Sequence, residues 1–96
     1  MITILKDDDR IVINGHAGYA PTGCDIVCSA ISVLTETLVA SLEELTYDEI
    51  SCHTDEGFTE IEYEKDLSEK SKLLIRSFFI GANGVADSYP EYVRII

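Results

Sequence analysis

Residues 25–45 read DIVCSAISVLTETLVASLEEL and carry a regular apolar pattern. Its apolar side chains recur every three or four positions, at Val27, Ile31, Leu34, Leu38, Leu42 and Leu45. That period places them along one side of an α-helix. Asp25 precedes the run, and its carboxylate can accept the free amide hydrogens of a first helical turn. The sequence therefore predicts an amphipathic helix over about residues 26–45, capped by Asp25.

Strand-like segments lie on both sides of this helix. Residues 2–6 and 11–13 are rich in isoleucine and valine and are joined by an acidic turn, which predicts a β-hairpin. After the helix, residues 47–53 and 58–65 read as a second hairpin around a turn at 54–57. In residues 58–65, Ile61 and Tyr63 alternate with glutamates, so one face is apolar and the other is charged.

A second helix is predicted after the second hairpin. Asp66 followed by Glu69 resembles a capping box, and apolar positions continue at helical spacing to about residue 88. Pro90 cannot continue a helix, and residues 92–96 are apolar enough for a last short strand. The order predicts an α+β fold, a single two-layer domain over residues 1–96. Two helices would pack on one face of a mostly antiparallel or mixed sheet of four to five strands.

Composition and charge restrict the kinds of partner and the cellular compartment that we expect. Seven basic and eighteen acidic residues give a net charge of −11, which disfavours direct nucleic-acid binding and favours a basic protein or peptide partner. The chain has no uninterrupted run of about 18 apolar residues and no basic start followed by an apolar stretch. We therefore expect a cytoplasmic protein without a membrane partner. Three cysteines in a reducing compartment argue against a disulfide framework.

One histidine and one cysteine flank the first loop, GHAGYAPTGC at residues 15–24. His16 follows a strand, and Cys28 falls in the first turn of the predicted helix. The amide hydrogens and dipole of a helix N-terminus stabilise a thiolate, and an imidazole nearby can take the thiol proton. The same amides could also bind a developing oxyanion. Asp25 is expected to act as the cap or to orient His16. Spacing alone leaves open that Cys28 is an inert core thiol.

A motif runs through Gly15-His16-Ala17, Gly23, Asp25 to Ala30, and Ser32 with Leu34. It closely resembles the signature of the ribosomal-processing cysteine protease family called Prp. Met1 to Ile4, Gly81 and residues 88–93 are also similar to that family. The resemblance implies a catalytic dyad of His16 and Cys28, with Asp25, Ser32, Gly15 and Gly23 in supporting positions. Ser29 stands where the family often has alanine, and Cys24 adds a second thiol near the nucleophile.

The resemblance also implies a function. Members of the family remove a short N-terminal extension from the basic large-subunit ribosomal protein numbered twenty-seven, during ribosome assembly. They use no cofactor and are typically homodimers. By this resemblance the chain would be a cysteine endopeptidase with that extension as its substrate and with no bound metal. Phe78 and Phe79 on the second helix are candidates for a dimer interface.

The sequence leaves two alternative functions open. The first is a small zinc-binding module that uses His16, Cys24 and Cys28 with Cys52 or His53, although the Cys-x-x-x-Cys spacing is not that of common zinc motifs. Cys52 and His53 are neighbours on a predicted strand and should point to opposite faces. The second is a non-enzymatic, ribosome-associated interaction protein that holds a basic partner through its acidic surface.

Overall fold

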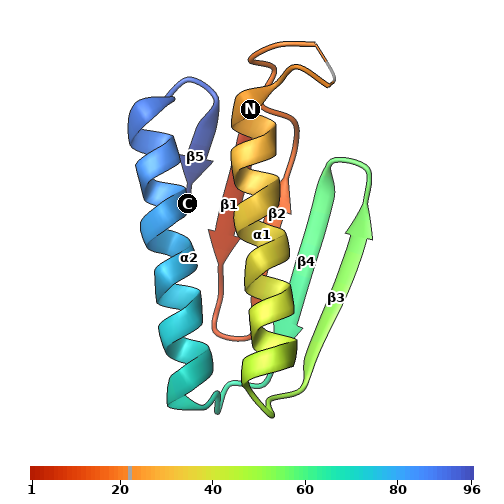
Figure 1. The fold of residues 1–96 in the computed structure, drawn as a ribbon, viewed down its shortest axis with the longest axis vertical. Coiled ribbons are helices and arrows are strands. Elements are labelled where there is room, and N and C mark those ends of the chain that lie inside the picture. Colours follow the sequence, from red (N-terminus) through yellow and green to blue (C-terminus); the bar gives the residue numbers. More distant parts are fainter. Residues whose placement is uncertain (22) are drawn as a thin grey trace.

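Two helices cover one face of a five-stranded sheet in the computed structural model, which describes residues 1–21 and 23–96 (Figure 1). In chain order the elements are β1 (Ile2–Lys6), β2 (Arg10–Asn14), α1 (Ile26–Leu45), β3 (Ile50–Asp55), β4 (Phe58–Tyr63), α2 (Glu69–Ser88) and β5 (Val93–Ile95). The predicted α+β, two-layer arrangement is confirmed. The bounds of the first helix and its Asp25 cap are also as predicted.

The strand order across the sheet is β3-β4-β2-β1-β5, and the sheet is mixed. β1 pairs antiparallel with β2, β2 with β4, and β4 with β3, whereas β5 lies parallel to β1. The parallel pair arises because α2 carries the chain back along the sheet before β5 begins (Figure 1). The hairpin of β3 and β4 therefore forms one edge, and β3 is the outermost strand there.

The core lies between the helices and the sheet. On β1, β2 and the second half of β4, alternate residues face the helices and are buried, among them Ile4, Ile11 and Ile61. The buried helix residues that meet them are Val27, Ile31, Leu38 and Leu42 of α1 and Ile75, Phe78 and Ala82 of α2. Removing these side chains from water is the main term that favours the fold. The helices approach closely where Gly81 faces Leu34, because a Cβ at Gly81 would lie 2.9 Å from Leu34 Cδ2.

The second helix differs from the prediction at its start. Ser68, not Asp66, caps α2, and its hydroxyl accepts the amide hydrogen of Ser71. The reason is a tertiary contact: Asp48, which precedes β3, accepts hydrogen bonds from the Ser68 amide (3.1 Å) and hydroxyl (2.6 Å) and from the Ser71 hydroxyl. β3 also begins at Ile50, three residues later than predicted, and runs on to Asp55.

The structure bears on two expectations about the surface, the dimer interface and the absence of a membrane partner. Phe78 is only 4% exposed and packs edge-on against half-buried Phe79, so Phe78 is a core residue, and Phe79 stays a candidate for the dimer interface. Within the described part of the chain, α1 is long and apolar enough by length and composition to cross a membrane. Its composition is equally that of a helix that packs on a sheet, and one of its sides is buried there.

Candidate active site

Cys28 lies in the first turn of α1 with its thiol half-buried. Its Sγ accepts a hydrogen bond from the main-chain amide of Ala17 at 3.2 Å. Ala17 is itself 4% exposed, so this donor is held in place by the core. The Ala17 amide therefore fixes the position of the Cys28 sulfur at the start of α1.

Asp25 ties the loop that follows His16 to the start of α1. One carboxylate oxygen, Oδ1, accepts the amide hydrogens of Val27 (3.0 Å) and Cys28 (2.9 Å). The other, Oδ2, accepts those of Tyr19 (3.0 Å) and Ala20 (3.4 Å). The bond from Cys28 is the largest cause that holds the pKa of Asp25 below its ordinary value. Partial desolvation opposes it, and the other three amides add to it.

These bonds settle what Asp25 contacts. All of its described hydrogen bonds go to main-chain amides, so it caps the helix and fixes the loop rather than bonding to His16. They also contradict the expectation that these amides at the start of the helix bind an oxyanion. The amides of Val27 and Cys28 are already bound to Asp25, so they are not free to serve as oxyanion donors.

His16 is presented at the end of β2 by an unusual main-chain conformation at Gly15. Gly15 has φ +99°, and a Cβ there would overlap the carbonyl oxygen of Met1, so only glycine fits. The main chain on both sides is bonded: the Gly15 amide donates to the Gly57 carbonyl (2.7 Å), and the Met1 nitrogen donates to the His16 carbonyl (2.6 Å). The imidazole is exposed beside the turn that joins β3 to β4.

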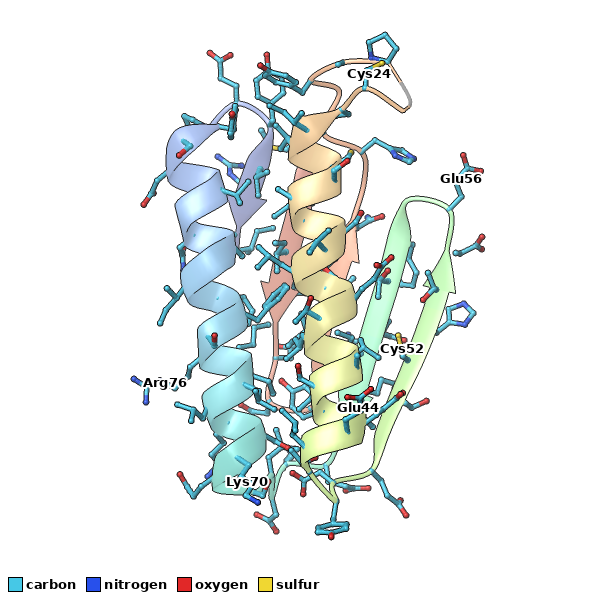
Figure 2. The ribbon with its side chains drawn as sticks, in the orientation of Figure 1. Cys24, Glu44, Cys52, Glu56, Lys70 and Arg76 are labelled. Atoms are coloured by element: carbon cyan, nitrogen blue, oxygen red, sulfur yellow. The ribbon has the colours of Figure 1, made fainter. Side chains whose placement is uncertain are left out.

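A groove of about 490 Å³ brings these residues together. One wall is α1, which contributes Cys28, Ser32, Thr35, Glu36, Val39 and Glu43. The other wall is the β3–β4 hairpin, which contributes Cys52, Thr54, Asp55, Gly57, Phe58 and Thr59. His16 and Gly15 close one end. Figure 2 shows the two walls running side by side, with Cys52 on the hairpin and Cys24 on the loop above the start of α1.

Four of the sequence-predicted residues thus share one site: His16, Cys28, Ser32 and Gly15 all line the groove. Asp25 lies behind it and holds the loop. Gly23 and Cys24 are exposed on the loop outside the groove lining. The residues missed from the sequence are those of the hairpin wall, since a strand pair more than twenty residues downstream carries no local signal that it faces Cys28.

The zinc-binding alternative finds no support in this geometry. Among residues 1–21 and 23–96, no three His, Cys, Asp or Glu side chains cluster closely enough to hold a metal ion. Cys52 lines the groove, whereas His53 pairs across the sheet with Glu60, whose side chain lies on the opposite face from the buried Ile61.

Comparisons with known proteins place the chain in a family. The model of the family described as cysteine protease Prp matches residues 1–94. No curated protein sequence gives a significant match. Among solved structures, SMU.848 from Streptococcus mutans is 31% identical over 99% of this chain and 91% of its own, with a TM-score of 0.76.

Two structures of the essential ribosomal processing protease Prp from S. aureus share the fold. The one in complex with a covalently linked product peptide has a TM-score of 0.92 at 22% identity, over 99% of this chain and 97% of its own. The one with a substrate peptide has a TM-score of 0.83 at 20% identity, over 99% of this chain and 95% of its own.

Proposed function

This chain belongs to the cysteine protease Prp family and is a cysteine protease, and we propose that Cys28 is its nucleophile and His16 its general base. The observation that carries the proposal is that both side chains line one groove, with the Cys28 sulfur held at the N-terminus of α1 by the Ala17 amide. Cys52 is the competing thiol in the groove, but it lies on an edge strand with no helix N-terminus beside it.

The proposed reaction needs no cofactor. His16 accepts the proton of the Cys28 thiol, and the thiolate attacks the scissile carbonyl carbon to form a C–S bond. When the tetrahedral intermediate collapses, the C–N bond breaks and the imidazolium gives its proton to the leaving amine. A water molecule, deprotonated by His16, then attacks the thioester. That second step releases the new carboxyl end of the peptide and restores the thiol.

We propose as substrate the N-terminal extension of large-subunit ribosomal protein twenty-seven. The S. aureus structures are described as those of an essential ribosomal processing protease, which supports a ribosomal protein as the target. The charge of the groove fits a basic chain: its described lining includes Glu36, Glu43 and Asp55 and no lysine or arginine. The groove runs between α1 and the β3–β4 hairpin, and we propose that the peptide lies along it in an extended form.

The remaining expectations are proposals of the same kind. We propose that the enzyme works in the cytoplasm, where ribosomes assemble, and that it forms a homodimer. Because Phe78 is buried, Phe79 is the remaining candidate of the two phenylalanines for the dimer contact. Size-exclusion chromatography with light scattering tests the dimer, and a monomer at micromolar concentration would contradict it.

The test of the proposed function is cleavage of the extended ribosomal protein from the same genome, followed by mass spectrometry. We expect one cut within the extension. Cys28→Ala and His16→Ala should abolish it without loss of the circular dichroism spectrum, whereas Cys52→Ala, the matched groove thiol, should retain it. Cleavage by Cys28→Ala would exclude Cys28 as the nucleophile, and loss of cleavage only in Cys52→Ala would move the nucleophile to β3.

A further inference from the structure

The turn between β3 and β4 touches the imidazole of His16. Gly57 occupies this turn with φ +67°. A Cβ at Gly57 would lie 2.8 Å from Nε2, 3.2 Å from Cδ2 and 3.4 Å from Cε1 of His16. Real Cβ atoms do not approach a ring nitrogen that closely, so the ring occupies the space that any side chain at position 57 would need. The imidazole therefore packs directly against the main chain of the turn.

The same glycine also holds the main chain that carries His16. Its carbonyl oxygen accepts the amide hydrogen of Gly15 at 2.7 Å. Gly15 immediately precedes His16, so one turn residue contacts both the ring and the peptide unit next to it. These residues are about forty positions apart in the chain. The contact holds the imidazole against the β3–β4 turn, at the end of the groove that Gly15 and His16 close.

We propose that Gly57 is a positioning residue for His16. Because Gly57 has no side chain, the imidazole can pack against the main chain of the turn, and the Gly57 carbonyl oxygen fixes the loop through its hydrogen bond to the Gly15 amide. The proposal rests on the proposed role of His16 as general base. A side chain at position 57 would displace the exposed ring rather than unfold the protein, because the obstacle is the end of a single rotatable side chain. Displacement by about 1 Å is enough to cost a reaction roughly 100-fold in rate.

The competing explanation is that Gly57 serves only the turn, since a positive φ favours glycine. Asparagine separates the two explanations. Asn tolerates the left-handed conformation and is common in tight hairpin turns, yet it carries a Cβ. If Gly57 serves only the turn, Gly57→Asn should behave as the wild type. If it seats the imidazole, Gly57→Asn should keep the fold and lose activity.

The experiment compares Gly57→Asn and Gly57→Ala with Glu56→Ala. Glu56 is the neighbouring turn residue, and its side chain points away from the molecule (Figure 2). For Gly57→Asn we expect kcat on the ribosomal substrate to fall roughly 10- to 100-fold with KM within about 2-fold. Glu56→Ala should match the wild type. The ring signals of His16 in the NMR spectrum should shift in both Gly57 variants, and His53→Gln identifies which histidine is which.

Each result decides one question. Wild-type kcat and unshifted His16 signals in Gly57→Asn would overturn the proposal. So would a loss of activity without any change in the His16 signals or in the pH profile of kcat, because that pattern indicates a structural role alone. If His16→Ala still cleaves, the proposed dyad fails, and the His16 signals by themselves still show whether Gly57 sets the position of the ring.

Discussion

The main-chain amide of Ala17 donates a 3.2 Å hydrogen bond to the sulfur of Cys28. Ala17 follows His16 directly, so the proposed base and the donor that holds the nucleophile are consecutive residues of one loop. The buried methyl group of Ala17 anchors this loop in the core next to α1. Any movement of the loop therefore changes the environment of the thiol and the position of the imidazole together.

The first prediction concerns thiol reactivity. Cys24 and Cys52 are exposed, whereas Cys28 is half-buried, so access alone would make Cys28 the slowest of the three thiols to react. We expect the opposite order, with Cys28 alkylated by iodoacetamide several-fold faster near pH 7, because the thiolate is the reactive form. Site-resolved mass spectrometry after a short pulse measures the rates. Equal rates at all three thiols, or fastest labelling at Cys24, would contradict an activated Cys28.

The second prediction separates the two tasks of Asp25. Asp25→Asn keeps an oxygen that can cap α1, but its amide group cannot accept all four main-chain hydrogens that the carboxylate now binds. We expect Asp25→Asn to melt within a few degrees of the wild type but to cleave at least roughly 10-fold more slowly, because the loop amides lose their acceptor. Asp25→Ala should lose both the helix cap and the acceptor for the loop amides. We therefore expect slower cleavage and a melting temperature lower by about 5 °C. Full activity in both variants would show that the loop needs no anchor.

The third prediction concerns acid stability. Hydrogen bonds, first from the Ser68 hydroxyl and then from that of Ser71, hold the pKa of Asp48 below its ordinary value of 3.8, although partial desolvation opposes them. The folded protein therefore binds a proton at Asp48 less readily than the unfolded chain does. The resulting stability is complete above pH 3.8 and is lost as the pH falls through the folded-state pKa. Urea unfolding from pH 5 to pH 2 should show a shallower decline in Asp48→Asn than in the wild type; parallel curves would contradict this.

The fourth prediction tests which residue caps α2. Ser68→Ala should lower the free energy of unfolding by about 1 kcal/mol, because it removes the acceptor for the Ser71 amide. Asp66→Ala should change it by less than about 0.5 kcal/mol, as expected for an exposed residue outside the cap. Denaturant unfolding of the two variants decides the matter, and a larger loss for Asp66→Ala would restore the cap that the sequence pattern favoured.

The fifth prediction compares two leucines of α1. Leu42 is fully buried and Leu45 is 58% exposed, although both fall on the apolar period of the helix. Leu42→Ala should cost about 2–5 kcal/mol of unfolding free energy through lost burial and a residual cavity. Leu45→Ala should cost less than about 1 kcal/mol, in proportion to the smaller area that it buries. Similar losses in chemical denaturation would mean that the end of α1 packs more tightly than the structure indicates.

The order of helices and strands and the candidate dyad could be predicted from patterns in the sequence. Helical spacing in residues 26–45, alternation in β4 and the position of Asp25 are local patterns, and local hydrogen bonds and side-chain periodicity decide them. His16 and Cys28 were identified because their motif is contiguous in the chain. The family match over residues 1–94 agrees with that identification of the family.

The residues that face these elements and the dyad could be identified only from the folded structure. The cap of α2 moved from Asp66 to Ser68 because Asp48, twenty residues earlier, accepts its hydroxyl hydrogen. Phe78 is buried in the core. The β3–β4 hairpin forms the second wall of the groove, and its Gly57 contacts His16. Contacts between distant segments depend on how whole faces pack and on strand register, and neither is written in the spacing of neighbouring residues. For that reason the sequence could suggest the proposed base and nucleophile but not the glycine that contacts the imidazole.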